Sequence, residues 1–322
     1  MRNGSKHKII FLQRYKQLIG RCVLLFLAGT ALQLCIGSVD TSFLAYPWGL
    51  VAAVNYLYIL IILYACREKL KFVKRMYDRP SYIASLASLL FLTLLFGLIP
   101  QDPSIGGWLD LFGFNQMSSS WIFVLFLFHF MTVLGLKAIE DVHCWRRRSI
   151  PTILMHVAFF VILVASAFGS GEKVRIQVTA IEGHPVSMGL TDKGMRVELP
   201  FTILLKDFSL DEYTPVVHLL PDGSEVVMPR REVKKYLSEV EIWKGEEKHS
   251  FEIAVNRPAS VGSWKIYQSG YDSSRGKFST ISILECVKDG GYLAVHIAMW
   301  TILLSSVLIF IMRTKNKKEV KE

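Results

Sequence analysis

The sequence predicts a membrane α-helical bundle of about six transmembrane helices, with an extracytoplasmic all-β domain, sandwich or open-barrel-like, between the fifth and sixth helix. Three observations predict it. Of the 322 residues, 52% are hydrophobic, which is too apolar for an ordinary soluble domain. The apolar residues gather in blocks of a length that spans a bilayer as a helix, roughly 17–25 residues. The stretch after the fifth block alternates apolar and polar residues, as strands with one buried face do.

Each predicted span is a block that carries almost no charge, Arg21 at the edge of the first being the exception. The five blocks before the β domain form a membrane region over residues 18–169, and the sixth helix occupies 291–312. The expected spans are Leu18–Gly37, Trp48–Cys66, Tyr82–Ile99, Trp121–Leu136 with its flanks, Ile150–Gly169 and Tyr292–Met312.

The basic residues indicate the orientation of these helices. The formal net charge of +10 comes largely from clusters at Arg2–Lys16, Arg67–Arg79, Lys137–Arg148 and Arg313–Lys321, whereas the loops 38–46 and 100–120 hold no Lys or Arg. Cytoplasmic loops carry the excess of Lys and Arg, so the N-terminus (1–17) and the basic tail (313–322) are expected inside. The basicity therefore reports topology, and nucleic acid is not an expected partner.

The segment 170–290 is the sizeable soluble domain, and this topology places it outside the membrane. It holds 16 Lys and Arg against 18 Asp and Glu, so it offers no electrostatic case for binding a polyanion. Turns are expected at Pro221–Gly223 and Lys244–Gly245, and a helical period is conceivable around Arg231–Ser238. The expected strands are Lys173–Val178, Arg196–Leu199, Glu239–Trp243, Ser250–Val255, Trp264–Tyr267 and Phe278–Ile283.

Residues that could carry covalent chemistry are few. The five cysteines form no C-x-x-C pair, and nothing resembles a hydrolytic triad or a paired-carboxylate site, so no catalytic residue is predicted. A thiol-exchange site and a structural zinc site are both disfavoured.

Three histidines, His129, His156 and His296, fall inside predicted spans, where ionisable side chains tend to face a cofactor or the bundle interior. A neutral imidazole is a good axial ligand for haem iron, and interhelical hydrogen bonding is the alternative. At 1.5 Å per residue, His156 lies roughly 9 Å from the cytoplasmic end of its helix. On the same basis His129 lies roughly 12 Å and His296 roughly 6 Å from the outer end, so either these two pair or each packs against a helix. His184, His218 and His249 are expected at the surface of the outer domain.

Several short motifs follow one another along the chain in the order in which one protein family has them. A basic loop leads into a span with an early histidine, and a short Gly-containing exit leads to a first strand that ends in Glu-Gly. The most specific piece is Val255-Asn-Arg-Pro258 followed by Gly262-Ser-Trp-Lys-Ile-Tyr-Gln-Ser-Gly-Tyr-Asp272. The other matching segments are Arg146–Phe160, Gly169–Glu172, Ile181–Gly183, Leu199–Phe201, Lys206–Phe208 with Tyr213, and Tyr236–Ser238. Over about Arg146–Met312 the chain resembles the ResB (CcsB) family of system II cytochrome c biogenesis, in the compact form that pairs with ResC (CcsA).

The resemblance implies a subunit of a haem-export and cytochrome c synthase complex in the bacterial cytoplasmic membrane. It implies b-type haem in transit, with His156 as one axial ligand and the second from a ResC/CcsA-like membrane protein, and apocytochrome c as the recipient. Two departures exist: Asp289-Gly-Gly291 and Val295–Ala298 stand where the family has D-P-W and V-Y-x-G. No tryptophan-rich W-W-D segment is present, so the partner that carries it would be a separate chain.

Alternatives accompany this interpretation. The chain would be at most a co-catalytic subunit, and a membrane sensor or assembly scaffold with structural histidines is a different class of function. The run Arg146–Arg148 either attracts haem propionates or anchors the topology. The residues of the specific outer run either contact apocytochrome and ResC or belong to the core and a turn; they are Asn256, Pro258, Tyr267, Gln268, Tyr271 and Asp272.

Overall fold

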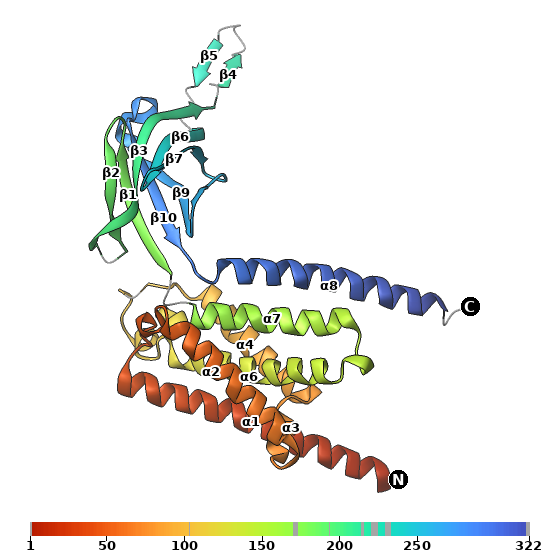
Figure 1. The fold of residues 1–322 in the computed structure, drawn as a ribbon. Helices are drawn as coiled ribbons and strands as arrows, with labels where there is room; N and C mark the ends of the chain where they lie inside the picture. The colour runs from red at the N-terminus through yellow and green to blue at the C-terminus, as the bar shows by residue number, and fades with distance from the viewer. Residues whose placement is uncertain are drawn as a thin grey trace. The chain divides into compact units, whose positions relative to one another are not determined.

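The computed structural model describes residues 2–102, 104–169, 173–192, 194–213, 216–219, 225–228 and 233–319. The chain divides into two compact units, a helical unit of Met1–Gly171 with Gly291–Glu322 and a β unit of Glu172–Gly290. Figure 1 labels their elements.

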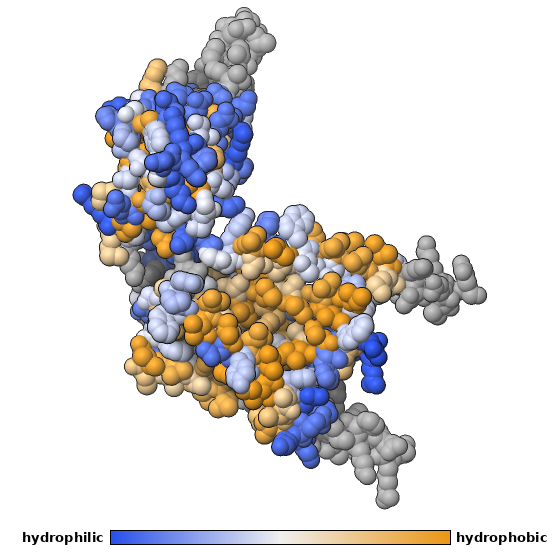
Figure 2. All heavy atoms as spheres, viewed as in Figure 1, coloured by the Kyte–Doolittle hydropathy of each residue, from blue (hydrophilic) through white to orange (hydrophobic). Residues whose placement is uncertain are grey.

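The helical unit contains six helices in the described residues that are long and apolar enough to cross a membrane, as the sequence predicted. Figure 2 shows apolar side chains over the outside of this unit, the reverse of a soluble protein and the arrangement that lipid favours. The helices are α1 (Arg2–Ile36), α2 (Trp48–Ala65), α3 (Lys71–Met76), α4 (Arg79–Leu98), α5 (Trp108–Leu111), α6 (Trp121–His143), α7 (Ile150–Phe168) and α8 (Tyr292–Glu319), with 3₁₀ turns at Ser42–Leu44, Cys66–Glu68, Phe114–Ser119 and Trp145–Arg147.

Helix α6 is the centre of this unit. Half of the residues in its most apolar stretch are buried, a larger share than in any other described span. Helices α1, α2, α4 and α7 pack around it, and α8 packs along α7. A small residue permits the closest approach: a Cβ on Gly135 would lie 2.6 Å from Leu60 of α2 and 2.7 Å from Phe160 of α7. The central helix thereby holds α2 and α7 in fixed positions.

The β unit is an eight-stranded antiparallel sheet with the order β7-β6-β3-β2-β1-β10-β9-β8. Its two end strands approach each other across a short turn, in which Ala254 and Arg257 exchange backbone hydrogen bonds, so the sheet is nearly closed into a barrel. The strands are β1 (Val174–Ile181), β2 (Pro185–Thr191), β3 (Arg196–Glu212), β6 (Val233–Lys244), β7 (Glu247–Ala254), β8 (Ala259–Val261), β9 (Trp264–Tyr271) and β10 (Ile281–Lys288), and β4 (Val216–Leu219) pairs with β5 (Glu225–Met228) as a separate hairpin.

Alternation along these strands fills the interior of the sheet. In β10, for example, Ser282, Leu284 and Cys286 are buried while their neighbours are less so. The buried apolar residues form one cluster that draws on every strand of the sheet except β2. This pattern confirms the expectation of an all-β domain, in its open-barrel form.

The local predictions differ from the structure at several points. The helical period around Arg231–Ser238 is wrong where the residues are described, because Val233–Lys244 forms β6 along the long strand β3. The last strand starts at Ile281, after a 3₁₀ segment at Ser273–Phe278. The turn at Lys244–Gly245 is confirmed, with Gly245 at φ +63°, and the one at Pro221–Gly223 lies outside the described residues.

Candidate functional site

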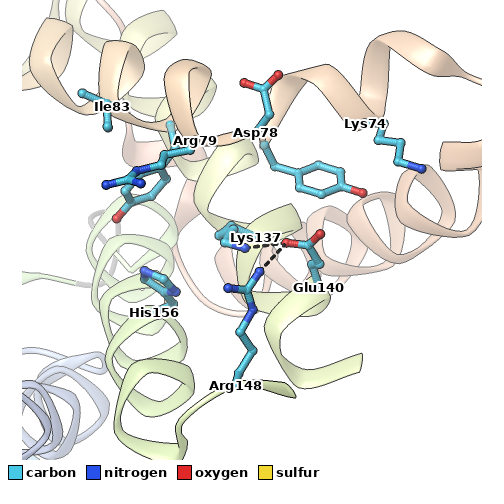
Figure 3. A pocket seen from close by; sticks show the side chains of 10 residues that line it. Lys74, Asp78, Arg79, Ile83, Lys137, Glu140, Arg148 and His156 are labelled. Carbon is cyan, nitrogen blue, oxygen red and sulfur yellow. Dashed lines mark hydrogen bonds and ion pairs between the residues drawn. The ribbon is translucent and has the colours of Figure 1, made fainter. Parts of the chain in front are cut away.

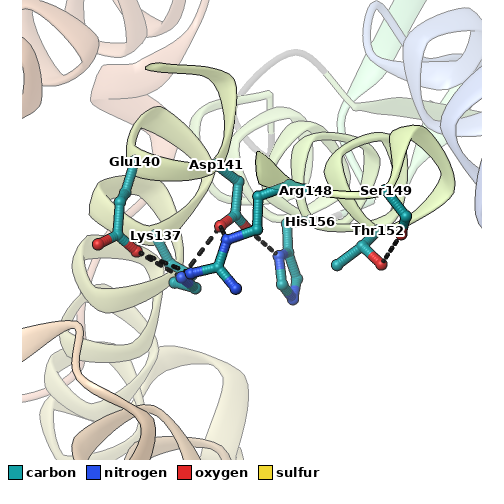
Figure 4. A network of polar contacts seen from close by, with 7 residues as sticks. All are labelled: Lys137, Glu140, Asp141, Arg148, Ser149, Thr152 and His156. Carbon is teal, nitrogen blue, oxygen red and sulfur yellow. Dashed lines mark hydrogen bonds and ion pairs between the residues drawn. The ribbon is translucent and has the colours of Figure 1, made fainter. Parts of the chain in front are cut away.

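The candidate site forms at the end of the helical unit where α6 and α7 are joined by a short loop. Pro151 stands in the first turn of α7, where a missing N–H costs nothing, and the helix carries His156 two turns in. Asp141 lies in the last turn of α6. His156 Nδ1 lies 2.6 Å from Asp141 Oδ2 in a hydrogen bond between the two helices (Figure 4).

Asp141 is the most deeply buried charge at this end, with a side chain 1% exposed. Two cations compensate it: its Oδ1 lies 3.0 Å from Lys137 Nζ and 3.3 Å from Arg148 Nε. Glu140 also pairs with Lys137, and its Oε2 lies 3.9 Å from Arg148 Nη2. A buried carboxylate is tolerated when it is paired and hydrogen-bonded in this way, so the network fixes Asp141 in place.

The hydrogen bond to Asp141 assigns a role to each nitrogen of His156. Because a carboxylate only accepts, Nδ1 donates, and in the neutral ring the lone pair then belongs to Nε2. Among the described residues Nε2 has no hydrogen-bond partner, and the Tyr82 ring stands edge-on with its centroid 5.7 Å from the imidazole centroid. A carboxylate behind an imidazole is the usual way to orient a histidine ligand toward a metal.

His156 faces a pocket of about 610 Å³, a size typical of small-molecule and cofactor sites (Figure 3). Aromatic and aliphatic side chains line part of it, and charged side chains line the rest. Burial raises the pKa of Tyr77 to about 12, so this phenol stays protonated. The lining residues are Lys74, Tyr77, Asp78, Arg79, Tyr82, Ile83, Lys137, Glu140, Arg148 and His156.

The start of α4 places Arg79 and Tyr82 at this pocket. Asp78 caps the helix by accepting a hydrogen bond from the Ser81 backbone N–H at 3.0 Å, and Pro80 follows in the first turn. The side chain of Arg79 is exposed and has no carboxylate within ion-pair distance among the described residues. The pocket therefore has walls from the α4 start, α6, the loop before α7, and α7.

The chemistry of this set suits haem as a cargo. It offers one oriented imidazole, aromatic side chains and an excess of cationic groups for anionic substituents. No group of three His, Cys, Asp or Glu side chains able to hold a bare metal ion occurs in the described part of the chain. His156 is the one histidine among the described residues that line the pocket.

The other membrane histidines lie elsewhere. His129 is half-buried on α6, and no hydrogen bond or ring contact joins it to His296 in the described residues. His296 is exposed on α8, where its ring stacks on Tyr292 with centroids 5.5 Å apart and its Nε2 accepts a hydrogen bond from Trp300 Nε1 at 3.2 Å. The structure thus brings neither of them to His156.

The outer motif residues differ in how deeply they are buried. Tyr271 packs against the apolar core, and Gln268 is buried. Asn256 lies in the turn after β7, with Pro258 just beyond it. Asp272 accepts hydrogen bonds from the Ser274 hydroxyl and from the Ser274 backbone N–H, and both lower its pKa. Tyr267 is partly buried in β9. His184 and His249 are exposed, and the side chain of His218 lies outside the described ones.

Sequence reasoning missed Asp141, Arg79 and Tyr82. Lys137 was counted as a determinant of topology alone, whereas Arg148 belonged to the run Arg146–Arg148, which was expected either to attract haem propionates or to anchor the topology. A usable signal was present: Glu140 and Asp141 are adjacent acids inside a basic cytoplasmic segment, three and four residues after Lys137. That spacing places a lysine and an acid on one face of a helix.

Comparison with known proteins supports the resemblance seen in the sequence. The model of the ResB-like family matches residues 146–289, which confirms the resemblance over that segment. No curated protein matches the chain. Among solved structures, "Cytochrome c Heme Lyase CcmF" is similar at a TM-score of 0.32 and 12% identity, over 82% of this chain and 46% of that one. The chain thus spans about half the length of that protein, and so low a TM-score carries no argument about function.

Proposed function

We propose that this chain, which resembles the ResB family over residues 146–289, acts in cytochrome c biogenesis as the subunit that holds haem in transit with His156. The observation that carries the proposal is the His156–Asp141 pair, because His156 lines a cation-rich pocket and its Nε2 has no hydrogen-bond partner among the described residues. The family match supports the role in cytochrome c biogenesis, and the pocket chemistry supports the cargo. Haem is the substrate here, and when bound it would supply the iron that Nε2 ligates.

Each residue of the site has a distinct part in this proposal. His156 binds the iron, Asp141 holds the ring in the Nδ1–H tautomer, and Lys137 pairs with Asp141 and holds it in place. The second axial ligand comes from a ResC/CcsA-like membrane protein. The β unit contacts apocytochrome c, and the thioether chemistry belongs to the complex as a whole.

The orientation of the chain is part of the same proposal. The basic segments 67–79 and 137–148 lie on the cytoplasmic side of a bacterial membrane, together with both termini. Haem made inside the cell would then reach the pocket at Arg79 and Arg148 directly, and the β unit would face the outside.

The test is a spectrum of the full chain purified in mild detergent with its ResC/CcsA-like partner. We expect a Soret band that His156→Ala abolishes and that the exposed-surface control His249→Ala leaves intact. In His156→Gly, added imidazole is expected to restore the band, because it can occupy the vacated space and supply the nitrogen. A complex without a Soret band, or one whose band survives His156→Ala, would reject the proposal.

A further inference from the structure

The cations around the His156 pocket differ in how far their charge is already neutralised. Lys74 Nζ lies 3.2 Å from Glu68 Oε1, and Lys137 pairs with both Glu140 and Asp141. Arg148 shares those two carboxylates with Lys137 at longer distances, 3.3 Å and 3.9 Å, and its side chain is 45% exposed. Arg79 pairs with no carboxylate among the described residues.

The two arginines therefore hold the charge that a ligand could use. They come from different elements, Arg79 from the first residue of α4 and Arg148 from the loop before α7, and both line the pocket that His156 faces (Figure 3). Lys137 alone is enough to keep a cation beside Asp141, at 3.0 Å. Arg148 can accordingly turn to a ligand without leaving Asp141 unpaired.

Guanidinium groups favour one ligand chemistry in particular. Their planar, forked donors bind carboxylates through two parallel hydrogen bonds, and they stay charged at any physiological pH. A haem carries two propionate carboxylates on one edge, whereas the rest of its ring is apolar. The pocket offers both kinds of surface, with the Tyr82 ring beside the imidazole and the two arginines among its lining residues.

We infer that Arg79 and Arg148 form a dicarboxylate-binding site that holds the propionate edge of the tetrapyrrole while His156 ligates its iron. This inference rests on the proposed function and deepens it. The site selects tetrapyrroles with free carboxylates over their esters, and it fixes which edge of the ring faces the charged mouth.

In the experiment, the full chain is purified in detergent as a complex with its ResC/CcsA-like partner. The complex is titrated in separate samples with hemin and with hemin dimethyl ester, and binding is followed by the Soret shift. In the native protein we expect hemin to bind at least tenfold more tightly than the ester. Arg79→Gln with Arg148→Gln is expected to weaken hemin binding at least tenfold and to leave the ester unchanged, because the ester lacks the charges that the arginines hold.

The matched control is Arg146→Gln with Arg147→Gln. It removes the same charge from the same end of the helical unit, at two exposed residues that do not line the pocket. Hemin affinity is expected to change less than twofold in this variant. If the double variant does not fold, Arg79→Gln alone replaces it, because Arg79 is exposed and has no ion pair among the described residues. This single variant should still weaken the binding of hemin and leave the binding of the ester unchanged.

The outcomes separate this inference from the proposed function. Equal affinity of the native protein for hemin and its ester overturns the inference, as does an equal loss in the pocket and control variants. The same results would follow if the arginines held an anionic lipid headgroup. If the Soret shift still depends on His156 in those cases, the proposed function stands; if no shift depends on His156, both fail.

Discussion

The two units of the molecule each bury a polar cluster, and the clusters differ in what remains unsatisfied. In the β unit, Ser238 Oγ lies 2.6 Å from Gln268 Oε1 and 2.8 Å from Ser282 Oγ, and Gln268 Nε2 donates to Ser282 Oγ and to the Gly270 carbonyl at 2.8 Å each. None of these three buried side chains lines the pocket between Glu239 and Ala259 in the same unit. The cluster is closed and specifies the packing of β6, β9 and β10.

The cluster in the helical unit is open. The charge of Asp141 is compensated by Lys137 and Arg148, yet His156, which lines a pocket of about 610 Å³, keeps one nitrogen without a partner among the described residues. Polar groups buried in a membrane protein are costly, so a polar group left unsatisfied beside a pocket indicates a ligand. The comparison teaches that unsatisfied bonding capacity beside a cavity, more than burial, distinguishes a site from a structural network.

The largest expected effect on haem binding comes from replacing Asp141, which belongs to the open cluster. Asp141→Ala should weaken haem binding roughly 10–100-fold, because nothing then fixes the tautomer and orientation of the His156 ring. Asp141→Asn should recover much of the loss, since its amide oxygen can still accept from Nδ1. The Soret band position and a haem titration measure both variants.

The conservative variant separates positioning from folding. Size-exclusion profiles in detergent should be the same for the Asn and Ala variants, while their haem spectra differ. Wild-type affinity and an unshifted Soret band in Asp141→Ala would show that the ring needs no carboxylate.

A smaller effect, on stability alone, is expected in the β unit. Gln268→Leu leaves the Ser238 and Ser282 hydroxyls short of partners and should lower the free energy of unfolding by roughly 1–3 kcal/mol. Ser238→Ala, Gln268→Leu and Ser282→Ala together should recover most of that loss, because the replaced cluster is then wholly apolar. Denaturation of the full chain in detergent, followed by the fluorescence of Trp243 and Trp264, measures both variants.

A haem titration of the β-unit variants tests whether the cluster in the β unit is structural only. Neither β-unit variant should change the affinity for hemin. A triple variant as unstable as the single one would show that the serines and Gln268 contribute more than mutual satisfaction.

The smallest expected effect concerns Cys286, buried on the same face of β10 as Ser282. Burial raises the pKa of this thiol from about 9.0 to about 12, so it stays protonated and unreactive toward maleimide at pH 8 until the unit unfolds. The unfolded chain ionises first, so this contribution to stability is present below pH 9 and is lost progressively as pH rises from about 9 to 12.

The check uses a variant in which Cys22, Cys35, Cys66 and Cys144 are serine. Mass spectrometry should find its thiol unlabelled at pH 8 in detergent and fully labelled in denaturant. Rapid labelling of the folded protein would mean that the interior of the sheet is open to solvent.

Prediction from sequence was strong where the signal is local. Each apolar block became a helix long enough to span a membrane, and each predicted alternating run overlaps a strand. Most of these strands extend further than predicted, and β2, β4, β5 and β8 were not predicted. The predictions failed where pairing between segments distant in sequence decides the structure. Around Arg231–Ser238 a weak helical period lost to pairing with β3, because a strand gains its hydrogen bonds from a partner distant in sequence.

The sequence by itself determined which segments cross the membrane, where the β unit lies along the chain, and which histidines were worth considering, since hydropathy, alternation and motif order are properties of consecutive residues. The side chains that surround each of those histidines follow from the tertiary structure. Asp141 and His156 are on different helices, and Arg79 reaches the same pocket from a third, so their meeting depends on how α4 and α7 pack around α6. Helix packing is set by side chains far apart in the chain, which no local pattern records.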